Sequence, residues 1–206
     1  MSTSRKLGFA TAAALAAFVG ACASSKVLIP PRMDLARCGT IGMINFEAGA
    51  DGDLGQFASQ EFLASVQAAQ PGTPVLELGA SQEVLYAVKR TTIDPETIKA
   101  IGKKYAVDAI VFGRYTTEEL RPRVSLDPAS LNASAEIQGH LESRIYDTRT
   151  GATLWTNTAG ARQTVAKVQL GGGGIAGGGQ SMDDVHDRLV HSLVDQVTTD
   201  FWPHWE

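Results

Sequence analysis

The order of short apolar runs and amphipathic segments most constrains the fold of this chain. Thr40–Phe46 is apolar with few charges, which is typical of a strand covered on both faces. Apolar residues from Leu54 to Val66 recur every three or four positions and predict a helix that ends before Gln70. Further strands are expected over 74–79 and 107–113, with helices over 81–89 and from Pro95 onward. This order predicts parallel strands joined by right-handed crossovers.

The second half of the chain carries a different pattern. From Ala135 to Ile145 apolar or small residues alternate with polar ones, and Asp147–Gly151 supplies a turn before Ala152–Trp155. A final helix is expected from a cap at Ser181 to about Phe201. We therefore predict an α/β fold with α+β character: a mixed sheet of about five strands, parallel at first and then an antiparallel hairpin, packed by three to four helices.

The first residues are typical of a secretory signal peptide. Arg5 and Lys6 precede an uncharged, Ala-rich run of 15 residues, Leu7–Ala21. That run is shorter than the roughly 20 residues of a spanning helix. It ends in Val19-Gly20-Ala21-Cys22, which resembles the bacterial lipobox. We predict a signal peptide over 1–21 and a lipoprotein in which Cys22 carries the lipid, with palmitate among its acyl chains. The alternative is an ordinary signal peptide with a coincidental cysteine. Ala23 in place of Asp implies, by resemblance to Gram-negative lipoproteins, sorting to the outer membrane.

The predicted mature chain is acidic and tethered. Lys+Arg 18 against Asp+Glu 22 gives 18 − 22 = −4, and loss of Arg5 and Lys6 gives 16 − 22 = −6, so nucleic acid is not an expected partner. Residues 22–38 are predicted to be the lipidated cysteine and a short extended tether containing Pro30-Pro31. The fifteen residues 23–37 reach about 50 Å at most. Residues 39–206 are predicted to be a single periplasmic domain.

No catalytic or metal-binding motif occurs in the sequence. His186 and His191 are five apart on the last predicted helix, about 140° around its axis, so they do not share a face. Cys38 is expected to be a small buried hydrophobe, with a reactive thiol or an intermolecular disulfide as alternatives. We predict no enzyme activity, no catalytic residue, no metal and no cofactor.

Two segments are candidates for contact with a protein partner. Gly171–Gly179 holds seven of the 21 glycines, and we expect a loop or flexible linker there, with Gly171, Gly174 and Gly177 as contact residues. Trp202 and Trp205 end the chain and are the other candidates, although docking onto the domain's own core is an equal alternative.

Two segments resemble a superfamily of envelope lipoproteins. Ile98–Gly113, with Tyr-Ala-Val-Asp-Ala before a strand ending in Gly, and Asp147–Trp155 carry the resemblance. The order and spacing of elements over roughly 39–200 are similar to the superfamily that contains the curli-export lipoprotein CsgG, the penicillin-binding-protein activator LpoB and the N-terminal domain of TolB. The resemblance implies a fold and an envelope location. Neither segment is catalytic.

These observations favour a protein held by its lipid on the periplasmic face of the outer membrane, acting as a non-catalytic interaction or scaffold module in envelope assembly. Its expected partners are the membrane, through the anchor, and envelope proteins, including other copies of itself. The first alternative is a CsgG-like export-channel subunit that contributes two hairpins to a shared pore. Polar residues on both faces of 152–169 count against it. The second alternative is an activator of a cell-wall synthase, for which the tether is short.

Overall fold

The computed structural model describes residues 26–49, 52–127, 130–171, 174–179 and 181–205, and within its long strands 119–132 and 167–177 are described by backbone alone. The chain divides into two compact units. The larger runs from Pro31 to Pro203, and the smaller combines the residues up to Pro30 with those from His204.

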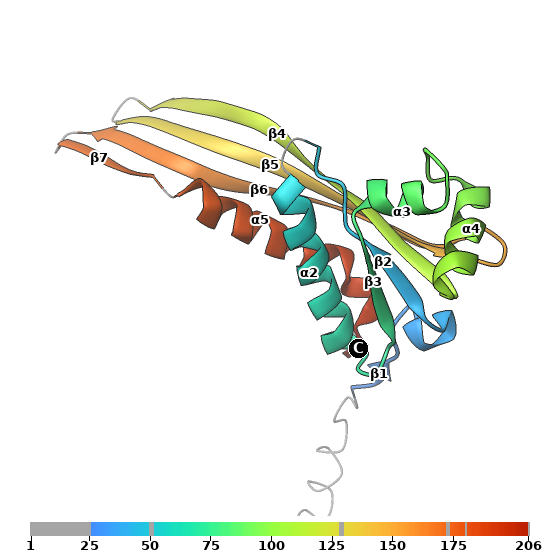
Figure 1. Ribbon diagram of the computed structural model, residues 1–206. Coiled ribbons are helices and arrows are strands. Elements are labelled where there is room, and N and C mark those ends of the chain that lie inside the picture. The colour runs from blue at the N-terminus through green and yellow to red at the C-terminus, as the bar shows by residue number, and fades with distance from the viewer. Residues whose placement is uncertain (1–25, 50–51, 128–129, 172–173, 180, 206) are drawn as a thin grey trace, which may run out of the picture. The chain divides into compact units, whose positions relative to one another are not determined.

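The larger unit is built on a six-stranded mixed sheet (Figure 1). Its order is β3-β2-β4-β5-β6-β7. β2 pairs in parallel with β3 and β4, and every other neighbouring pair is antiparallel. The predicted fold class is confirmed, with one strand more than expected in this sheet. The strands are β2 (Ile41–Ile44), β3 (Val75–Gly79), β4 (Ala109–Asp127), β5 (Ser130–Asp147), β6 (Thr153–Gly171) and β7 (Gly174–Gly179).

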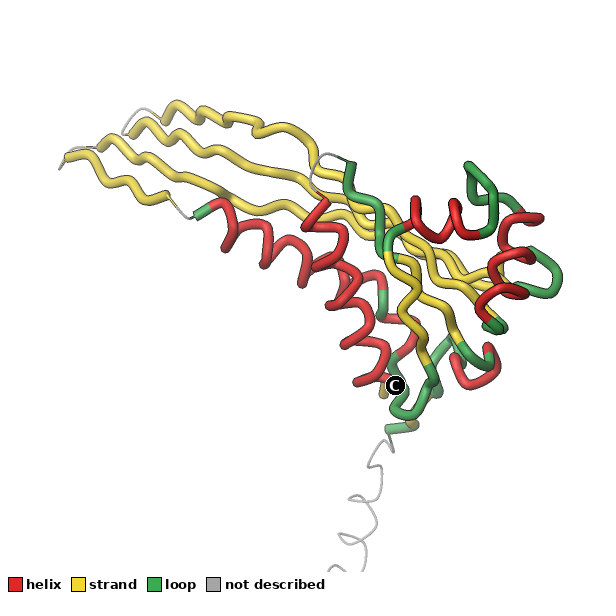
Figure 2. The backbone as a smooth tube through the Cα atoms, in the orientation of Figure 1, coloured by secondary structure: helices red, strands yellow, loops and turns green. Residues whose placement is uncertain are grey.

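Helices cover both faces of the short-strand end of the sheet (Figure 2). α2 (Gly52–Ala69) and α5 (Met182–Val197) pack on one face, where Phe62, Leu141 and Leu189 belong to one buried cluster. α3 (Ser81–Ala87) and α4 (Pro95–Tyr105) pack on the other, where Val84 and Ile101 belong to a second cluster. Two single-turn 3-10 helices, η1 (Leu35–Cys38) and η2 (Thr199–Phe201), complete the unit.

Local sequence signals account for the ends of several helices. Pro95 opens α4, as predicted, and Asp94 caps it by accepting a hydrogen bond from the Thr97 backbone N–H at 2.7 Å. Ser181 accepts from the Asp184 N–H at 3.1 Å and caps α5, also as predicted. Ser81 is not a cap, because Ala80 holds that position and the Ser81 hydroxyl instead donates to Glu47 Oε1 at 3.0 Å.

Three expectations about the long strands are corrected. The strand predicted over 107–113 continues to Asp127, and the one predicted over 135–145 occupies Ser130–Asp147. The Gly-rich run is not a loop: Gly171 is the last residue of β6, and Gly174–Gly179 forms β7. Pairing with β6 fixes a backbone that a glycine sequence leaves free.

The smaller unit contains a two-stranded antiparallel sheet. β1 (Leu28–Ile29) pairs with β8 (His204–Trp205), so that Leu28 lies opposite Trp205 and Ile29 opposite His204. Residues 31–38, part of the tether predicted from the sequence, belong to the larger unit, and both Leu35 and Cys38 are buried in its core.

Candidate functional site

Strands β4, β5 and β6 continue beyond the helical layer, with the shorter β7 beside β6, as Figures 1 and 2 show. We name this part the sheet extension and define it as the paired segments that lie at the bulges in β4 and β6 and on their tip side, together with β7. Its residues are 121–127 of β4, 130–136 of β5, 164–171 of β6 and 174–179 of β7. Because α5 begins at Met182, directly after β7, the helix runs back along the sheet and away from the extension.

The register gives the extension one face of apolar and glycine residues. Residues directly opposite one another in antiparallel strands share a face. Three cross-strand rows alternate with rows that hold Asp127, Arg123 and Lys167. From the tip inward the three rows are Leu126-Leu131-Leu170-Ile175, Val124-Ala133-Val168-Gly177 and Pro122-Ala135-Ala166-Gly179.

This apolar face continues the core face of the sheet. Odd-numbered residues of β5 are buried beneath the helices: Ile137 and Leu141 are in the core, and a Cβ on Gly139 would meet Leu189 and Leu193 of α5. The next odd-numbered residues, Ala135 and Ala133, are only half-buried. The hydrophobic face of the sheet therefore continues beyond the part that α5 covers.

Bulges explain why the sequence pattern concealed this face. The register shifts on β4 between Glu118 and Arg121, and on β6 where Glu136 pairs with Thr164 and Ala135 with Ala166. Each extra residue moves the following side chains to the other face. The observed register places Arg162 and Lys167 on the polar face, whereas Asn157 and Gln163, opposite Ser143 and Ile137, stay on the core face.

The extension has two open edges. β2 pairs with β4 only over Ala109–Val111, and an isolated bridge joins Glu47 to Arg114. Beyond that point β5 is the one ladder partner of β4 among the described residues, and β6 is the one ladder partner of β7. Gly178 and Gly179 on β7 are exposed, with nothing within 4 Å of an added Cβ. Unpaired edges of this kind accept further strands.

The opposite face of the long strands carries a linked polar network. Arg162 Nε donates to Gln138 Oε1 at 2.9 Å, and the Gln138 amide lies 2.9 Å from His140 Nε2. His140 Nε2 is in turn 3.6 Å from Glu118 Oε1. Because these groups satisfy one another across β4, β5 and β6, this face is suited to water, in contrast with the apolar face.

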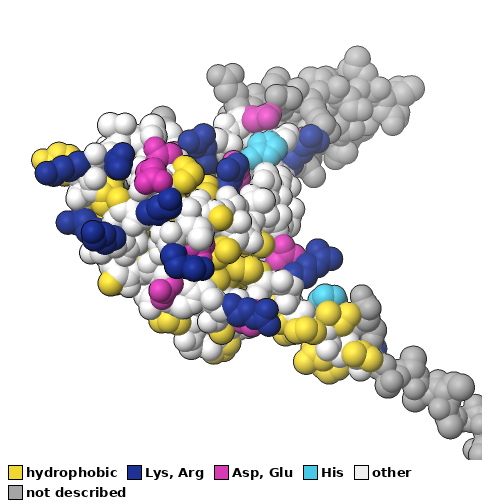
Figure 3. Space-filling model, turned by 90° about the vertical axis from the view of Figure 1, so that its right-hand side faces the viewer, with side chains coloured by type: hydrophobic (Ala, Val, Ile, Leu, Met, Phe, Trp, Pro, Cys, Tyr) yellow, Lys and Arg dark blue, Asp and Glu magenta, His cyan; other side chains and the backbone are white. Residues whose placement is uncertain are grey.

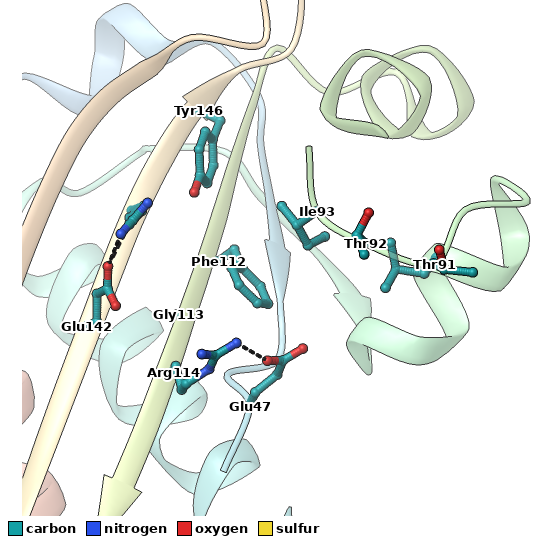
Figure 4. Close-up of a pocket in the computed structure, with 11 residues that line it drawn as sticks. Glu47, Thr91, Thr92, Ile93, Phe112, Gly113, Arg114, Glu142 and Tyr146 are labelled. Atoms are coloured by element: carbon teal, nitrogen blue, oxygen red, sulfur yellow. Dashed lines mark hydrogen bonds and ion pairs between the residues drawn. The ribbon is translucent and has the colours of Figure 1, made fainter. Parts of the chain in front are cut away.

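An open groove lies on the α3/α4 side of the sheet (Figure 4). Its volume is about 430 Å³ and it contains two ion pairs, Arg114–Glu47 at 3.1 Å and Arg144–Glu142. The hydrogen bond that Arg144 donates to the Glu142 carboxylate raises the pKa of the Arg144 guanidinium above its ordinary value. Each arginine is matched by a carboxylate, so the groove has no field of one sign that would select a phosphate or a metal ion.

The remaining predicted site residues belong to different parts of the chain. Cys22 is outside the described residues. Trp202 is 40% exposed in the larger unit and Trp205 is 64% exposed in the smaller one. Cys38 is buried, as predicted, and burial together with Asp34 and Asp147 raises the pKa of its thiol, which disfavours a nucleophilic role.

Two further features are absent from the residues that the structure describes. No group of three or more His, Cys, Asp or Glu there is arranged to hold a metal ion. No described helix combines the length and the hydropathy needed to cross a bilayer.

Comparison with known proteins gives structural neighbours but no family. No family model matches the chain, and no curated protein matches it. The PelC dodecamer of Paraburkholderia phytofirmans is 13% identical, covering 86% of this chain and 96% of that one, with a TM-score of 0.46. Lipoprotein GNA1162 of Neisseria meningitidis is 17% identical over 77% and 96%, with a TM-score of 0.40.

The C-terminal domain of LpoB from Escherichia coli is a further neighbour, 10% identical over 61% of this chain and 84% of that one, with a TM-score of 0.34. The neighbours thus include bacterial lipoproteins. At TM-scores below 0.5 they establish neither a common fold nor a common function with this chain.

Proposed function

We propose that this protein is a non-catalytic component of the bacterial envelope, anchored through Cys22 on the periplasmic face of the outer membrane, that works by binding other proteins through the sheet extension. The observation that carries the proposal is the apolar face of the extension. This face extends beyond the part of the sheet that α5 covers, so that Ala135 and Ala133 are only half-buried. Exposed apolar patches on proteins often mark contact sites.

Other copies of the same chain are the partners that the extension fits best. The extension has four antiparallel strands, so its edges β4 and β7 run in opposite directions. When β7 of one copy lies beside β4 of the next, the antiparallel alternation continues from copy to copy. Such a contact is head-to-tail and closes into a ring when the rotation between copies permits.

A charge on one face of the extension tests this proposal. Ala135→Glu places a carboxylate on the apolar face, and Ser134→Glu places the same carboxylate on the polar face one residue away. In mild detergent the wild type and Ser134→Glu should elute as a multimer, and Ala135→Glu as a monomer with unchanged circular dichroism. A wild type that is monomeric at all concentrations, and that traps no protein by crosslinking in intact cells, overturns the proposal.

A subunit of an export channel is the second candidate function. It is favoured by the two adjacent hairpins, β4–β5 and β6–β7, which share one apolar face. The length of the apolar face counts against this function. Its three rows span 122–126 of β4, roughly 17 Å at about 3.4 Å per residue. Outer-membrane proteins that cross the bilayer with strands have an apolar band about 25 Å tall. Protein contact therefore remains the first candidate. Ion conductance of the purified multimer in planar bilayers would reverse that order.

The activator of a cell-wall synthase gains no support from the structure. Leu28 of β1 is six positions after Cys22, a reach of about 20 Å. The free lead is therefore shorter than the 23–37 segment expected from the sequence, and an activator that reaches the inner membrane needs a long one.

The anchor has its own test. Cys22→Ala should release the protein from the membrane fraction, and mass spectrometry of the wild-type N-terminus should find Cys22 acylated. A Cys22→Ala variant that stays with the membrane would remove the anchor from the proposal.

A further inference from the structure

The small β1–β8 sheet exposes more apolar surface than its size accounts for. Leu28 and Trp205 are directly opposite one another, 50% and 64% exposed, and Val27 beside them is 61% exposed. Figure 3 shows hydrophobic side chains gathered with a histidine on this unit. Leu28 and Trp205 share one face of the ladder, since opposite residues of paired strands do.

A two-residue ladder is not stable in water by itself. Isolated two-stranded sheets are marginal even when longer, because they lack a partner that covers an apolar face. Here the pairing Leu28–Trp205 and Ile29–His204 is the whole ladder. The exposed pair of side chains therefore requires a surface to rest on.

The position of this sheet along the chain identifies that surface. Leu28 follows Cys22 by six residues, which reach about 20 Å at most. If Cys22 carries the lipid, the Leu28–Trp205 pair lies within that distance of the bilayer surface in every conformation of the lead. Tryptophan is enriched at the level of the lipid headgroups, where its ring is buried and its N–H meets water.

We infer that the β1–β8 sheet is a membrane-contacting foot, in which Val27, Leu28 and Trp205 insert into the headgroup–acyl boundary of the bilayer that holds the lipid on Cys22. This inference rests on the proposed acylation of Cys22. Exposed Lys26 precedes the apolar residues and supplies a positive charge for anionic headgroups. The foot orients the protein on the membrane, while the acyl chains supply the affinity.

Quenching of tryptophan by brominated lipid tests the foot. Full-length acylated protein is reconstituted into vesicles of phosphatidylethanolamine and phosphatidylglycerol, part of which is brominated near the headgroup end of the acyl chains. The wild type should be quenched, and Trp205→Phe should lose most of that quenching. Trp202→Phe is the matched control, because Trp202 is outside the β1–β8 ladder, and it should retain the quenching that Trp205 gives. Trp155 is only 9% exposed and gives an internal unquenched signal.

A second variant and flotation of the vesicles separate the two proposals. Leu28→Ser should reduce the quenching of Trp205 without reducing the fraction of protein that floats. Wild-type protein that floats but is not quenched overturns the foot and leaves the anchor intact. Protein that neither floats nor carries lipid by mass spectrometry overturns the anchor. A blue shift of Trp205 that rises with protein concentration in the absence of vesicles identifies a second copy as the occupant and also overturns the foot.

Discussion

At the scale of single residues, Gly102 and Thr148 set how closely α4 approaches the β5–β6 turn. A Cβ on Gly102 would overlap the Thr148 side chain. Thr148 is held in place because its hydroxyl donates to the Val107 and Asp108 carbonyls at 2.8 and 2.9 Å. Gly102 and Thr148 lie in the two segments on which the sequence resemblance rests, and the contact between them is one of packing.

Gly102→Ala should therefore destabilise the protein. Overpacking costs about 1–3 kcal/mol, against a gain of up to about 1 kcal/mol from replacing glycine in a helix. We expect a lower urea midpoint with an unchanged slope. Gly178→Ala on the open edge of β7, where an added Cβ meets nothing within 4 Å, should stay within about 0.5 kcal/mol of the wild type. Equal midpoints for Gly102→Ala and the wild type would contradict the contact.

Two aspartates give the fold its sensitivity to acid. Backbone hydrogen bonds from Thr150 and Thr97 lower the pKa of Asp147 and of Asp94, respectively, below the ordinary value. Each carboxylate therefore stabilises the fold above its unfolded pKa, about 3.9, and that stabilisation is lost as the pH falls through the lower folded value. The double variant Asp94→Asn/Asp147→Asn should show a weaker fall in urea midpoint below about pH 4 than the wild type. Parallel curves would assign the acid sensitivity to other groups.

At the scale of elements, α5 is the helix that closes the core face. Its buried residues include Leu189 and Leu193, which lie over the missing side chain of Gly139. Leu189→Ala should cost about 2–5 kcal/mol, the range for large-to-small changes in cores. Asp187→Ala on the exposed side of the same helix should stay within about 0.5 kcal/mol. Urea unfolding followed by circular dichroism measures both, and a similar cost for the two would contradict the packing of α5.

Elements with strong local signals were predictable from the sequence, and those fixed by pairing were not. Asp94-Pro95 and Ser181 mark helix starts through their own backbone hydrogen bonds, and both were found where expected. By contrast, β7 is six residues of Gly, Ile and Ala that have no strand signal and are ordered by the ladder to β6. The bulges likewise depend on neighbouring strands, so the apolar face of the extension became visible only from the register.

The candidate site was predicted only in part for the same reason. The sequence predicts Gly171, Gly174 and Gly177 as partner contacts on a loop. In the structure Gly171 is the last residue of β6, and Gly174 and Gly177 belong to β7, an edge strand of the extension. Trp205 was chosen as an exposed terminal residue. Its pairing with Leu28, near Cys22 in the chain, joins residues 177 positions apart (205 − 28), and no local pattern indicates it.

At the scale of the whole molecule, edge-to-edge assembly makes a prediction about crosslinks. Arg123 and Gly178 belong to one cross-strand row at opposite edges of the extension. In mild oxidant, Arg123→Cys/Gly178→Cys should give a ladder of disulfide-linked multimers, and each single variant should give none. Background is low because Cys38 is buried and an acylated Cys22 has no thiol. Dimers from Gly178→Cys alone would contradict the head-to-tail contact and indicate a two-fold arrangement.

The β1–β8 pairing also determines how mechanical load enters the protein. The chain passes between the two units twice, at Pro30–Pro31 and at Pro203–His204. If Cys22 carries the lipid as proposed, a pull exerted through it reaches β1 first, and the ladder passes part of that pull to β8 and so to the C-terminal end of the larger unit. The force on an anchored assembly is therefore shared by two covalent connections, and removal of residues 204–206 leaves only one to bear it.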